Sequence, residues 1–194
     1  HVLSRRQRQM CIRDRIMYHG QTLFAVVADT RAQARDAVEQ VKTKITPLAP
    51  ILSIDAAIEQ ESFLEKPLTL SSGQVENAYA AAPCQLAGEL YAGGQEHFYL
   101  EGQAAIAQAD ENGGIQLFVS TQHPSEIQHK VAGMLGLGYG DIQVDVRRMG
   151  GGFGGKESQS NLTACIAALA AHKTGRPARL VYDRDDDMRV TGKR

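Results

Sequence analysis

One glycine-rich stretch, "RRMGGGFGGKESQ" (147–159), limits the possible fold of this chain more than any other feature. It follows "DIQVDVRRM", whose alternating apolar residues are typical of a strand. It precedes "SQSNLTACIAALAAHKTG", which is typical of an apolar helix ending at Gly175. Glycine adopts positive φ angles at little cost. The sequence therefore predicts a strand, a tight turn of main chain around Phe153, and a buried helix, in that order.

Two nucleotide-binding patterns overlap in this stretch. Gly150, Gly152 and Gly155 match G-x-G-x-x-G of dinucleotide-binding folds, and Gly150 to Lys156 match G-x-x-x-x-G-K of phosphate-binding loops. Glu157 stands where the phosphate loop needs Ser or Thr, and its carboxylate would repel phosphate. Asp183 lies 28 residues after Gly155 (183 − 155), beyond the roughly 20 expected for a ribose-binding acid. A dinucleotide-binding domain and a glycine turn without a ligand both remain alternatives.

The region around the loop has the pattern of an α+β fold with mixed sheets. "AAIAQADENGGIQLFVST" predicts a hairpin with its turn at Asn112 to Gly114. "HPSEIQHKVAGMLGLG" predicts an amphipathic helix that begins near Pro124 and ends at Gly136. "RPARLVYD" predicts one more strand. The helix is expected to bury four residues on one face: Ile127, Val131, Met134 and Leu135.

The first half of the chain has a weaker pattern. Strands are predicted at 22–29 and 49–54, with a helix at 30–45 between them that Asp29 or Thr30 would cap. Residues 59–83 are polar and have the character of a connection between domains. The alternation in "CQLAGELYAGG" (84–94) predicts a half-exposed strand.

Composition excludes several classes of partner. The 194 residues carry a net charge of −1, so no basic surface for nucleic acid or anionic membrane is indicated, and no apolar run would span a bilayer. The three cysteines are scattered, which argues against a disulfide framework and against an iron–sulfur or zinc site in this chain. A reducing, cytoplasmic location is expected.

The first fifteen residues, "HVLSRRQRQMCIRDR", differ in character from the rest. They are rich in arginine and lack apolar periodicity, and no signal-peptide core follows them. The segment is interpreted either as a basic targeting arm or as a non-native addition. In both cases residues 1–15 are expected to be disordered and outside the fold.

Two long motifs carry a resemblance to a known family. "GGQEHFYLEGQ" (93–103) and "RRMGGGFGGKESQ" resemble the molybdenum hydroxylases, and within them the molybdenum-binding subunit of the xanthine dehydrogenase group. The resemblance extends over residues 16–194. It implies the end of an α/β hammerhead domain at 16–58, a linker at 59–83, and the truncated N-terminal part of a molybdopterin-binding domain at 84–194.

The resemblance also implies roles for individual residues. The side-chain amide of Gln95 would approach the molybdenum centre, and Gly152, Phe153 and Gly154 would line the molybdenum–molybdopterin cofactor with main-chain N–H groups. Glu157 would stand in the first turn of the following helix and orient the substrate. Among other candidates, His97 is expected to be structural, the acidic run 183–187 to be a solvated loop, and His123 and His129 to have no role.

The activity that the resemblance implies is hydroxylation of hypoxanthine and xanthine to urate, with electrons passing to [2Fe-2S], FAD and NAD in a partner subunit or domain. A homo- or hetero-oligomer is expected. A related hydroxylase of aldehydes or N-heterocycles is the alternative. The family's general base and its substrate-binding arginine would lie beyond Arg194, so the 194-residue chain is expected to be inactive alone.

Overall fold

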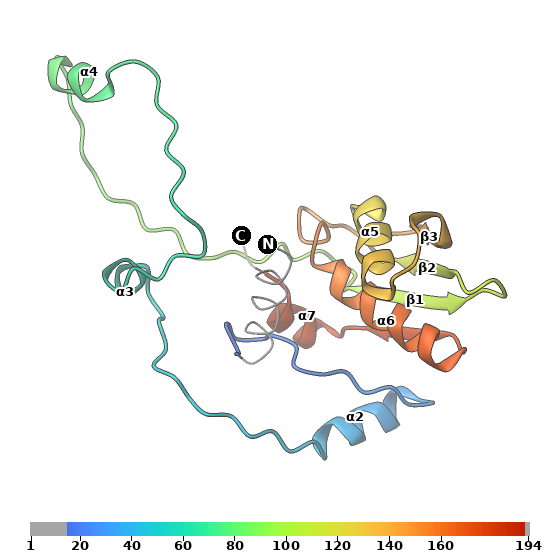
Figure 1. Cartoon of the computed structure of the whole chain (residues 1–194). Helices are drawn as coiled ribbons and strands as arrows, with labels where there is room; N and C mark the ends of the chain where they lie inside the picture. The colour runs from blue at the N-terminus through green and yellow to red at the C-terminus, as the bar shows by residue number, and fades with distance from the viewer. Residues whose placement is uncertain (1–14, 193–194) are drawn as a thin grey trace. The chain divides into compact units, whose positions relative to one another are not determined.

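A four-stranded sheet forms the centre of the fold. The computed structural model describes residues 15–192, and the strands are β1 (Ala104–Ala109), β2 (Ile115–Val119), β3 (Ile142–Asp145) and β4 (Ala178–Val181). Their order in the sheet is β3-β2-β1-β4 (Figure 1). β1 pairs antiparallel with β2 and β4, whereas β2 and β3 are parallel. The predicted hairpin and the predicted strands around the glycine stretch are confirmed.

Two helices, α5 (Pro124–Leu135) and α6 (Ser160–Thr174), pack against this sheet and bury its core. The short helix η1 (Tyr139–Asp141) leads from α5 into β3. The two central strands, β1 and β2, send alternate residues into the core, as a sheet with one covered face requires. The core consists mainly of Ala105, Ala107, Ile115, Leu117, Val119, Ile127, Val131, Ala132, Ile142, Ala164, Ala167, Ala168 and Ala171.

The ends of α5 follow the sequence signals closely. Pro124 is at the start of the helix and Gly136 caps its end with a φ of 72°. Ile127 and Val131 are buried as predicted, but Met134 remains 41% exposed. The prediction for Met134 was wrong because the sheet covers a narrower face of α5 than the apolar pattern suggested.

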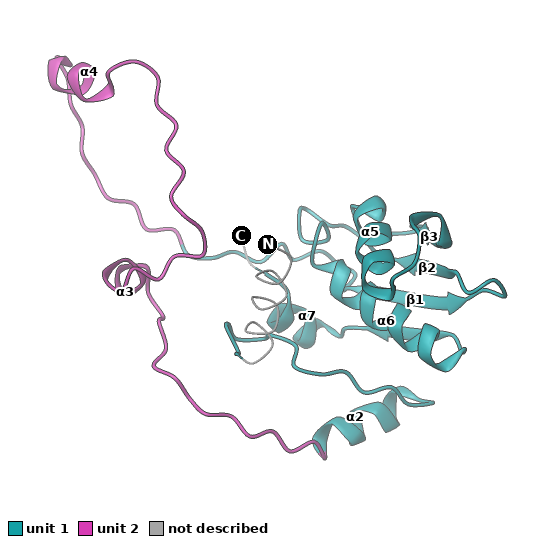
Figure 2. Cartoon of the chain, viewed as in Figure 1, with its two compact units in different colours: residues 1–39, 93–194 teal, residues 40–92 magenta. Residues whose placement is uncertain are grey.

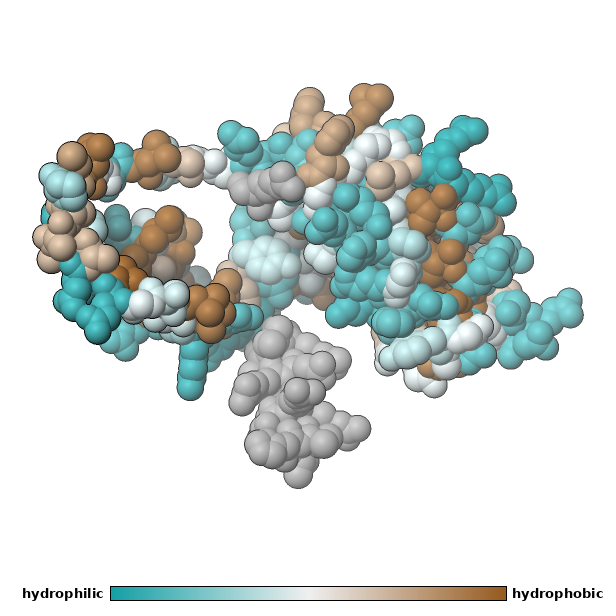
Figure 3. All heavy atoms as spheres, turned by 90° about the horizontal axis from the view of Figure 1, so that it is seen from above, coloured by the Kyte–Doolittle hydropathy of each residue, from teal (hydrophilic) through white to brown (hydrophobic). Residues whose placement is uncertain are grey.

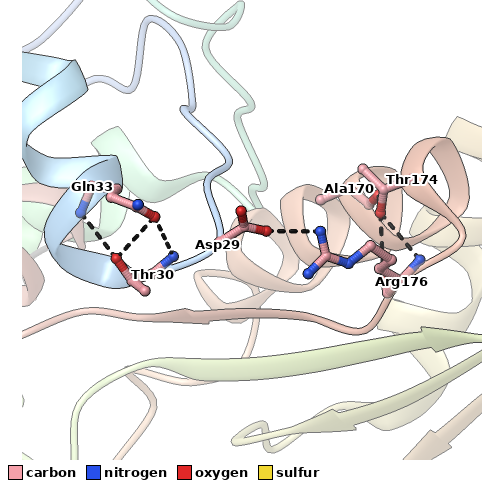
Figure 4. A network of polar contacts seen from close by, with 6 residues as sticks. All are labelled: Asp29, Thr30, Gln33, Ala170, Thr174 and Arg176. Carbon is pink, nitrogen blue, oxygen red and sulfur yellow. Dashed lines mark hydrogen bonds and ion pairs between the residues drawn. The ribbon is translucent and has the colours of Figure 1, made fainter.

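Residues 15–39 contain helix α2 (Arg31–Glu39) but no strand. Thr30 caps α2, since its Oγ1 accepts a hydrogen bond from the N–H of Gln33 at 3.3 Å while Gln33 Oε1 accepts one from the N–H of Thr30 at 3.1 Å (Figure 4). Asp29 instead pairs with Arg176 at 2.7 Å. Residues 22–29 do not form the predicted strand, and α2 ends six residues before the predicted end (45 − 39) and buries no residue.

The chain divides into two compact units, residues 1–39 with 93–194, and residues 40–92 (Figure 2). The second unit contains α3 (Ile54–Glu59) and α4 (Val75–Ala81), and none of its residues is buried. Hydrophobic residues lie open at its surface (Figure 3), among them Leu64 and Leu86 at 98% and 97% exposure. The strands predicted at 49–54 and 84–94 are not strands, because no neighbouring strand is present to pair with either segment.

The fold is mixed α/β with one sheet over the described residues, rather than the several sheets expected. The hammerhead description of residues 16–58 is not confirmed. The expectation of disorder for residues 1–15 falls on a segment that, except for Arg15, lies outside the described residues. No helix between residues 15 and 192 has the length and apolar character to cross a membrane.

Candidate functional site

The glycine stretch forms an irregular loop between β3 and α6. Gly150, Gly151 and Gly154 have φ angles of 68°, 89° and 91°, in the region that side chains with a Cβ rarely adopt. Phe153 joins them with a φ of 51° and is 69% exposed. An exposed aromatic residue held at positive φ is costly unless the surroundings require it. These features mark residues 150–154 as a candidate site.

One side of this loop packs closely on the segment before β1. A Cβ on Gly150 would lie 2.4 Å from Cβ of Glu101, and a Cβ on Gly155 would lie 2.5 Å from the ring of Tyr99 and 2.8 Å from that of His97. Only glycine fits such an approach. The motif at 93–103 and the glycine loop, about 50 residues apart in the sequence, are therefore in contact.

Two carbonyl groups of the loop are held on this packed side. Gly155 O accepts a hydrogen bond from Gln103 Nε2 at 2.9 Å, and Gly150 O accepts one from the N–H of Glu101 at 3.3 Å. By contrast, the N–H groups of Gly151, Gly152 and Phe153 make no hydrogen bond to any described residue. The loop thus presents main-chain donors without protein partners, an arrangement suited to anionic oxygens.

Gln122, directly after the sheet, supports the loop from another direction. Its Oε1 accepts hydrogen bonds from the N–H groups of Gly154 at 3.0 Å and Lys156 at 3.2 Å. Its own N–H donates to Lys156 O at 2.8 Å. A Cβ on Gly152 would lie 2.5 Å from the same Oε1. The glutamine that contacts the loop is therefore Gln122, which the sequence interpretation missed, although its place between a strand and a helix start was a usable signal.

Lys156 is fully buried at the end of the loop. Its Nζ donates hydrogen bonds to Ser120 Oγ at 2.8 Å and to Met149 O, and it lies 4.6 Å from the centre of the Tyr99 ring. Burial lowers the pKa of Lys156, while the charges of Asp187 and Glu101 oppose that shift. A lysine that binds nucleotide phosphates must reach out to them, so this geometry excludes the phosphate-loop interpretation.

A buried polar network continues from Lys156 to α7 (Arg184–Val190). Tyr99 OH donates a hydrogen bond of 2.7 Å to Asp187 Oδ1, and the N–H of Gln103 donates one of 3.0 Å to Asp187 Oδ2. Burial, and then the bond to Asp187, raise the pKa of Tyr99 to about 12. Asp187 is only 1% exposed, so the expectation that 183–187 is a solvated loop was wrong. The run instead begins a helix capped by Asp183, whose side chain accepts the N–H of Asp186.

The topology does not support a dinucleotide-binding domain. Such a fold places the loop between two parallel strands of one βαβ unit. Here β3 lies at one edge of the sheet and β4 at the other, where β4 pairs antiparallel with β1. Asp183, considered for the ribose, caps α7 and pairs with Arg31 and Arg35.

The predicted site residues have different surroundings. Gly152, Phe153 and Gly154 lie in the loop. Gln95 is exposed, two residues before His97, which packs against Gly155. Glu157 is also exposed and precedes Ser160, the first residue of α6, by three residues (160 − 157), so its predicted place in the first helical turn was wrong. Residues 156–159 instead form the turn before the helix. Lys156 at its start and Ser160 directly after it are both buried, and Ser160 Oγ donates a hydrogen bond to Lys156 O.

No group of three or more His, Cys, Asp or Glu side chains that could hold a metal ion is present among residues 15–192. The candidate site therefore consists of main-chain donors, one amide side chain and a buried cation. A model of the molybdopterin cofactor-binding domain matches residues 58–194, more than two thirds of the chain. The chain belongs to this family.

Relatives of this molybdopterin cofactor-binding domain include oxidoreductases of two kinds. The chain is 45% identical over 183 residues to xanthine dehydrogenase/oxidase of Felis catus, and 42% identical over 183 residues to aldehyde oxidase 1 of Oryctolagus cuniculus. These alignments cover 94% and 93% of the chain but 14% of each relative, so the chain spans about a seventh of their length.

Solved structures share the same fold. Aldehyde oxidoreductase from Desulfovibrio gigas is 27% identical with a TM-score of 0.71, over 86% of this chain and 19% of that protein. Quinoline 2-oxidoreductase from Pseudomonas putida 86 is 26% identical with a TM-score of 0.68, over 82% of this chain and 21% of that protein. The similarity to these oxidoreductases thus extends from sequence to three-dimensional structure.

Proposed function

We propose that this chain holds part of the molybdenum–molybdopterin cofactor of a molybdenum hydroxylase, and that loop 150–156 is its contact surface. The observation that carries the proposal is the orientation of the loop's main chain. The carbonyl groups of Gly150 and Gly155 are held by residues 101–103, while three N–H groups, at 151–153, have no partner among the described residues.

The chemistry of these donors fits such a cofactor. The oxygens of a molybdenum–pterin group and of its phosphate are anionic, and neutral N–H donors bind them without adding a charge. Lys156 contributes a buried positive charge next to the donors. The loop contains no carboxylate between Gly150 and Lys156 that would oppose anion binding.

Four residues are assigned to the cofactor site. Gly152 and Phe153 supply main-chain N–H groups. Gly154 lies beside them but, contrary to the sequence prediction, its N–H is not free for the cofactor, because it donates to Gln122 Oε1 at 3.0 Å. Gln122 holds the loop with its Oε1, while its Nε2 makes no hydrogen bond within the described part of the chain. Gln95 stays a prediction that rests on the motif at 93–103. The two glutamines are separable by substitution, because only Gln122 is bonded to the loop.

When bound, the cofactor supplies a two-electron oxidation that transfers an oxygen derived from water to an electron-poor carbon. The residues of this chain bind and orient, and the exposed Glu157 would pair with the N–H groups and ring nitrogens of xanthine or hypoxanthine. Electrons would leave through [2Fe-2S], FAD and NAD held by other domains or subunits. A cytoplasmic location and an oligomeric assembly stay predictions.

A hydroxylase of aldehydes or N-heterocycles is the second candidate. The relatives named aldehyde oxidase are nearly as similar as those named xanthine dehydrogenase/oxidase, at 42% against 45% identity. Glu157 favours the purine substrate, because an aldehyde offers no N–H group to a carboxylate.

The test is the cofactor content and substrate range of the enzyme that carries this chain. Molybdenum and pterin are quantified per polypeptide, and the formation of urate from xanthine is compared with oxidation of benzaldehyde and quinoline. Stoichiometric molybdopterin with urate formation supports the proposal. Molybdopterin without urate formation shifts the assignment to the second candidate, and absence of molybdopterin contradicts both.

A further inference from the structure

Lys156 connects the two ends of the glycine loop. Its main chain stands at the end of the loop, and its Nζ donates to the carbonyl of Met149 at the loop's beginning. Ser120 Oγ accepts from the same ammonium at 2.8 Å and also donates to Met149 O at 2.8 Å. One side chain therefore joins the two ends of residues 149–156 and fixes the main chain between them.

The main chain of Lys156 is held equally firmly. Its carbonyl oxygen accepts hydrogen bonds from the N–H of Gln122 at 2.8 Å, from Thr121 Oγ1 at 3.2 Å and from Ser160 Oγ at 3.3 Å. Its N–H donates to Gln122 Oε1 at 3.2 Å. With the side chain and the main chain both fixed, the N–H groups between Gly151 and Phe153 keep one orientation.

The positive charge of Lys156 is not neutralised by direct contact. No carboxylate of residues 15–192 lies within ion-pair distance of its Nζ, which contacts two neutral oxygens and the face of Tyr99. Asp187 and Glu101 act on it from further away. Because water is excluded from a buried site, an uncompensated charge there acts over a longer distance than one at the surface.

We propose that Lys156 is a positioning residue for the anionic cofactor: it fixes the orientation of the loop's N–H donors, and its buried charge favours the binding and the reduced form of a negatively charged group on the loop. The proposal rests on the proposed function and adds to it. In the phosphate-loop pattern this lysine would contact the ligand directly. Here its Nζ instead contacts Ser120, Met149 and the ring of Tyr99, and it acts on the ligand through the loop.

The experiment separates the charge of Lys156 from its hydrogen bonds. Lys156→Gln keeps a donor near Ser120 and Met149 but removes the charge, and Lys156→Met removes both. Ser120→Ala removes one partner and leaves the charge. Lys130→Gln removes an exposed positive charge from α5 and serves as the surface control. All four are made in the enzyme that carries this chain.

Three quantities are measured for each variant: molybdenum and pterin per polypeptide after dialysis, the midpoint potential of the molybdenum centre by EPR-monitored redox titration, and the midpoint of thermal unfolding. We expect both Lys156 variants to retain cofactor about tenfold more weakly and to have a lower midpoint potential. Ser120→Ala should unfold at a lower temperature with an unchanged potential. Lys130→Gln should change neither the potential nor the retention.

Each outcome decides a different question. If the wild-type enzyme holds no molybdopterin, the proposed function fails before Lys156 is tested. If the wild type is loaded and the Lys156 variants have its potential and cofactor content, the role of the charge is refuted. Loss of folding in both Lys156 variants, with Ser120→Ala intact, would also refute it and assign Lys156 to stability alone.

Discussion

The hydroxyl of Tyr99 donates a hydrogen bond of 2.7 Å to Asp187 Oδ1, and this bond ties the segment that packs under the glycine loop to helix α7. Both side chains are 1% exposed. The N–H of Gln103 donates to the other carboxylate oxygen at 3.0 Å. The candidate site thus rests on a polar network that joins residues 88 positions apart in the sequence.

This network should contribute measurably to stability. Tyr99→Phe removes one bond to a charged acceptor and should lower the free energy of unfolding by about 1.5 to 3 kcal/mol. Asp187→Ala should cost more, since the Tyr99 O–H and the N–H of Gln103 both lose their acceptor, and the hydroxyl keeps the bond that it accepts from Gln103 Nε2. Chemical denaturation of the two single variants and the double variant measures the coupling. Strictly additive losses would mean that the bond contributes nothing of its own.

The titration of Tyr99 should reduce the stability of the fold at alkaline pH. Its pKa is raised from 10.0 to about 12, mainly by burial, so the native state keeps the proton that the unfolded chain loses first. Its contribution to stability should therefore be complete below pH 10 and disappear as the pH rises from about 10 to about 12. Thermal unfolding against pH measures this, with Tyr99→Phe expected to lose less stability over that interval. Tyr91→Phe, at a residue 90% exposed, should follow the wild type.

Gly152 should tolerate no side chain. A Cβ there would lie 2.5 Å from Gln122 Oε1, so Gly152→Ala must displace the amide that holds Gly154 and Lys156. Overpacking of this kind costs about 1 to 3 kcal/mol. Gly133→Ala is the matched control. Gly133 lies inside α5, and a Cβ added there would have no atom within 4 Å, so this substitution should raise the free energy of unfolding by about 0.5 to 1 kcal/mol. Equal unfolding midpoints of the two variants would contradict the loop geometry.

Substitution of Gln122 and of Gln95 tests two separate roles in cofactor retention. Gln122→Ala removes the acceptor for two loop N–H groups and should lower the molybdenum content of the enzyme about tenfold. Gln95→Ala alters an exposed residue and is expected to matter only if its amide approaches the metal, as the motif at 93–103 predicts. Metal analysis of both purified variants compares the two roles. Full retention by Gln122→Ala would remove Gln122 from the proposed site.

The proposed contact of Glu157 with the substrate predicts a difference between the two substrate classes. Glu157→Val should lower kcat/KM for xanthine by about tenfold or more, equivalent to about 1.4 kcal/mol of transition-state stabilisation, while aldehyde oxidation is preserved or improved. Steady-state kinetics with xanthine and benzaldehyde provide the comparison. Equal losses on both substrates would show that Glu157 supports the loop, and an unchanged xanthine rate would exclude it from the site.

Local sequence was sufficient where the stabilising contacts are themselves local. The turn of the hairpin forms because Asp110 Oδ1 accepts the N–H groups of Asn112 and Gly114, both at 2.8 Å and within four residues. Pro124 and Gly136 limit α5 in the same local way. The predicted strands at 49–54 and 84–94 failed because a strand needs a partner, which the residues themselves do not supply.

The sequence by itself determined that a strand, a glycine loop and an apolar helix follow one another, because φ preferences and apolar periodicity act over a few residues. Only the tertiary structure decided that Gln122 holds the loop, that Lys156 is buried with its Nζ on Ser120 and Met149, and that Asp187 is buried. Apart from Met149, which lies 7 positions from Lys156, the partners of these side chains lie 32 to 88 positions away. Their roles follow from the packing of the sheet against its helices, which brings distant polar groups together in the interior, where a buried polar group needs a hydrogen-bond partner.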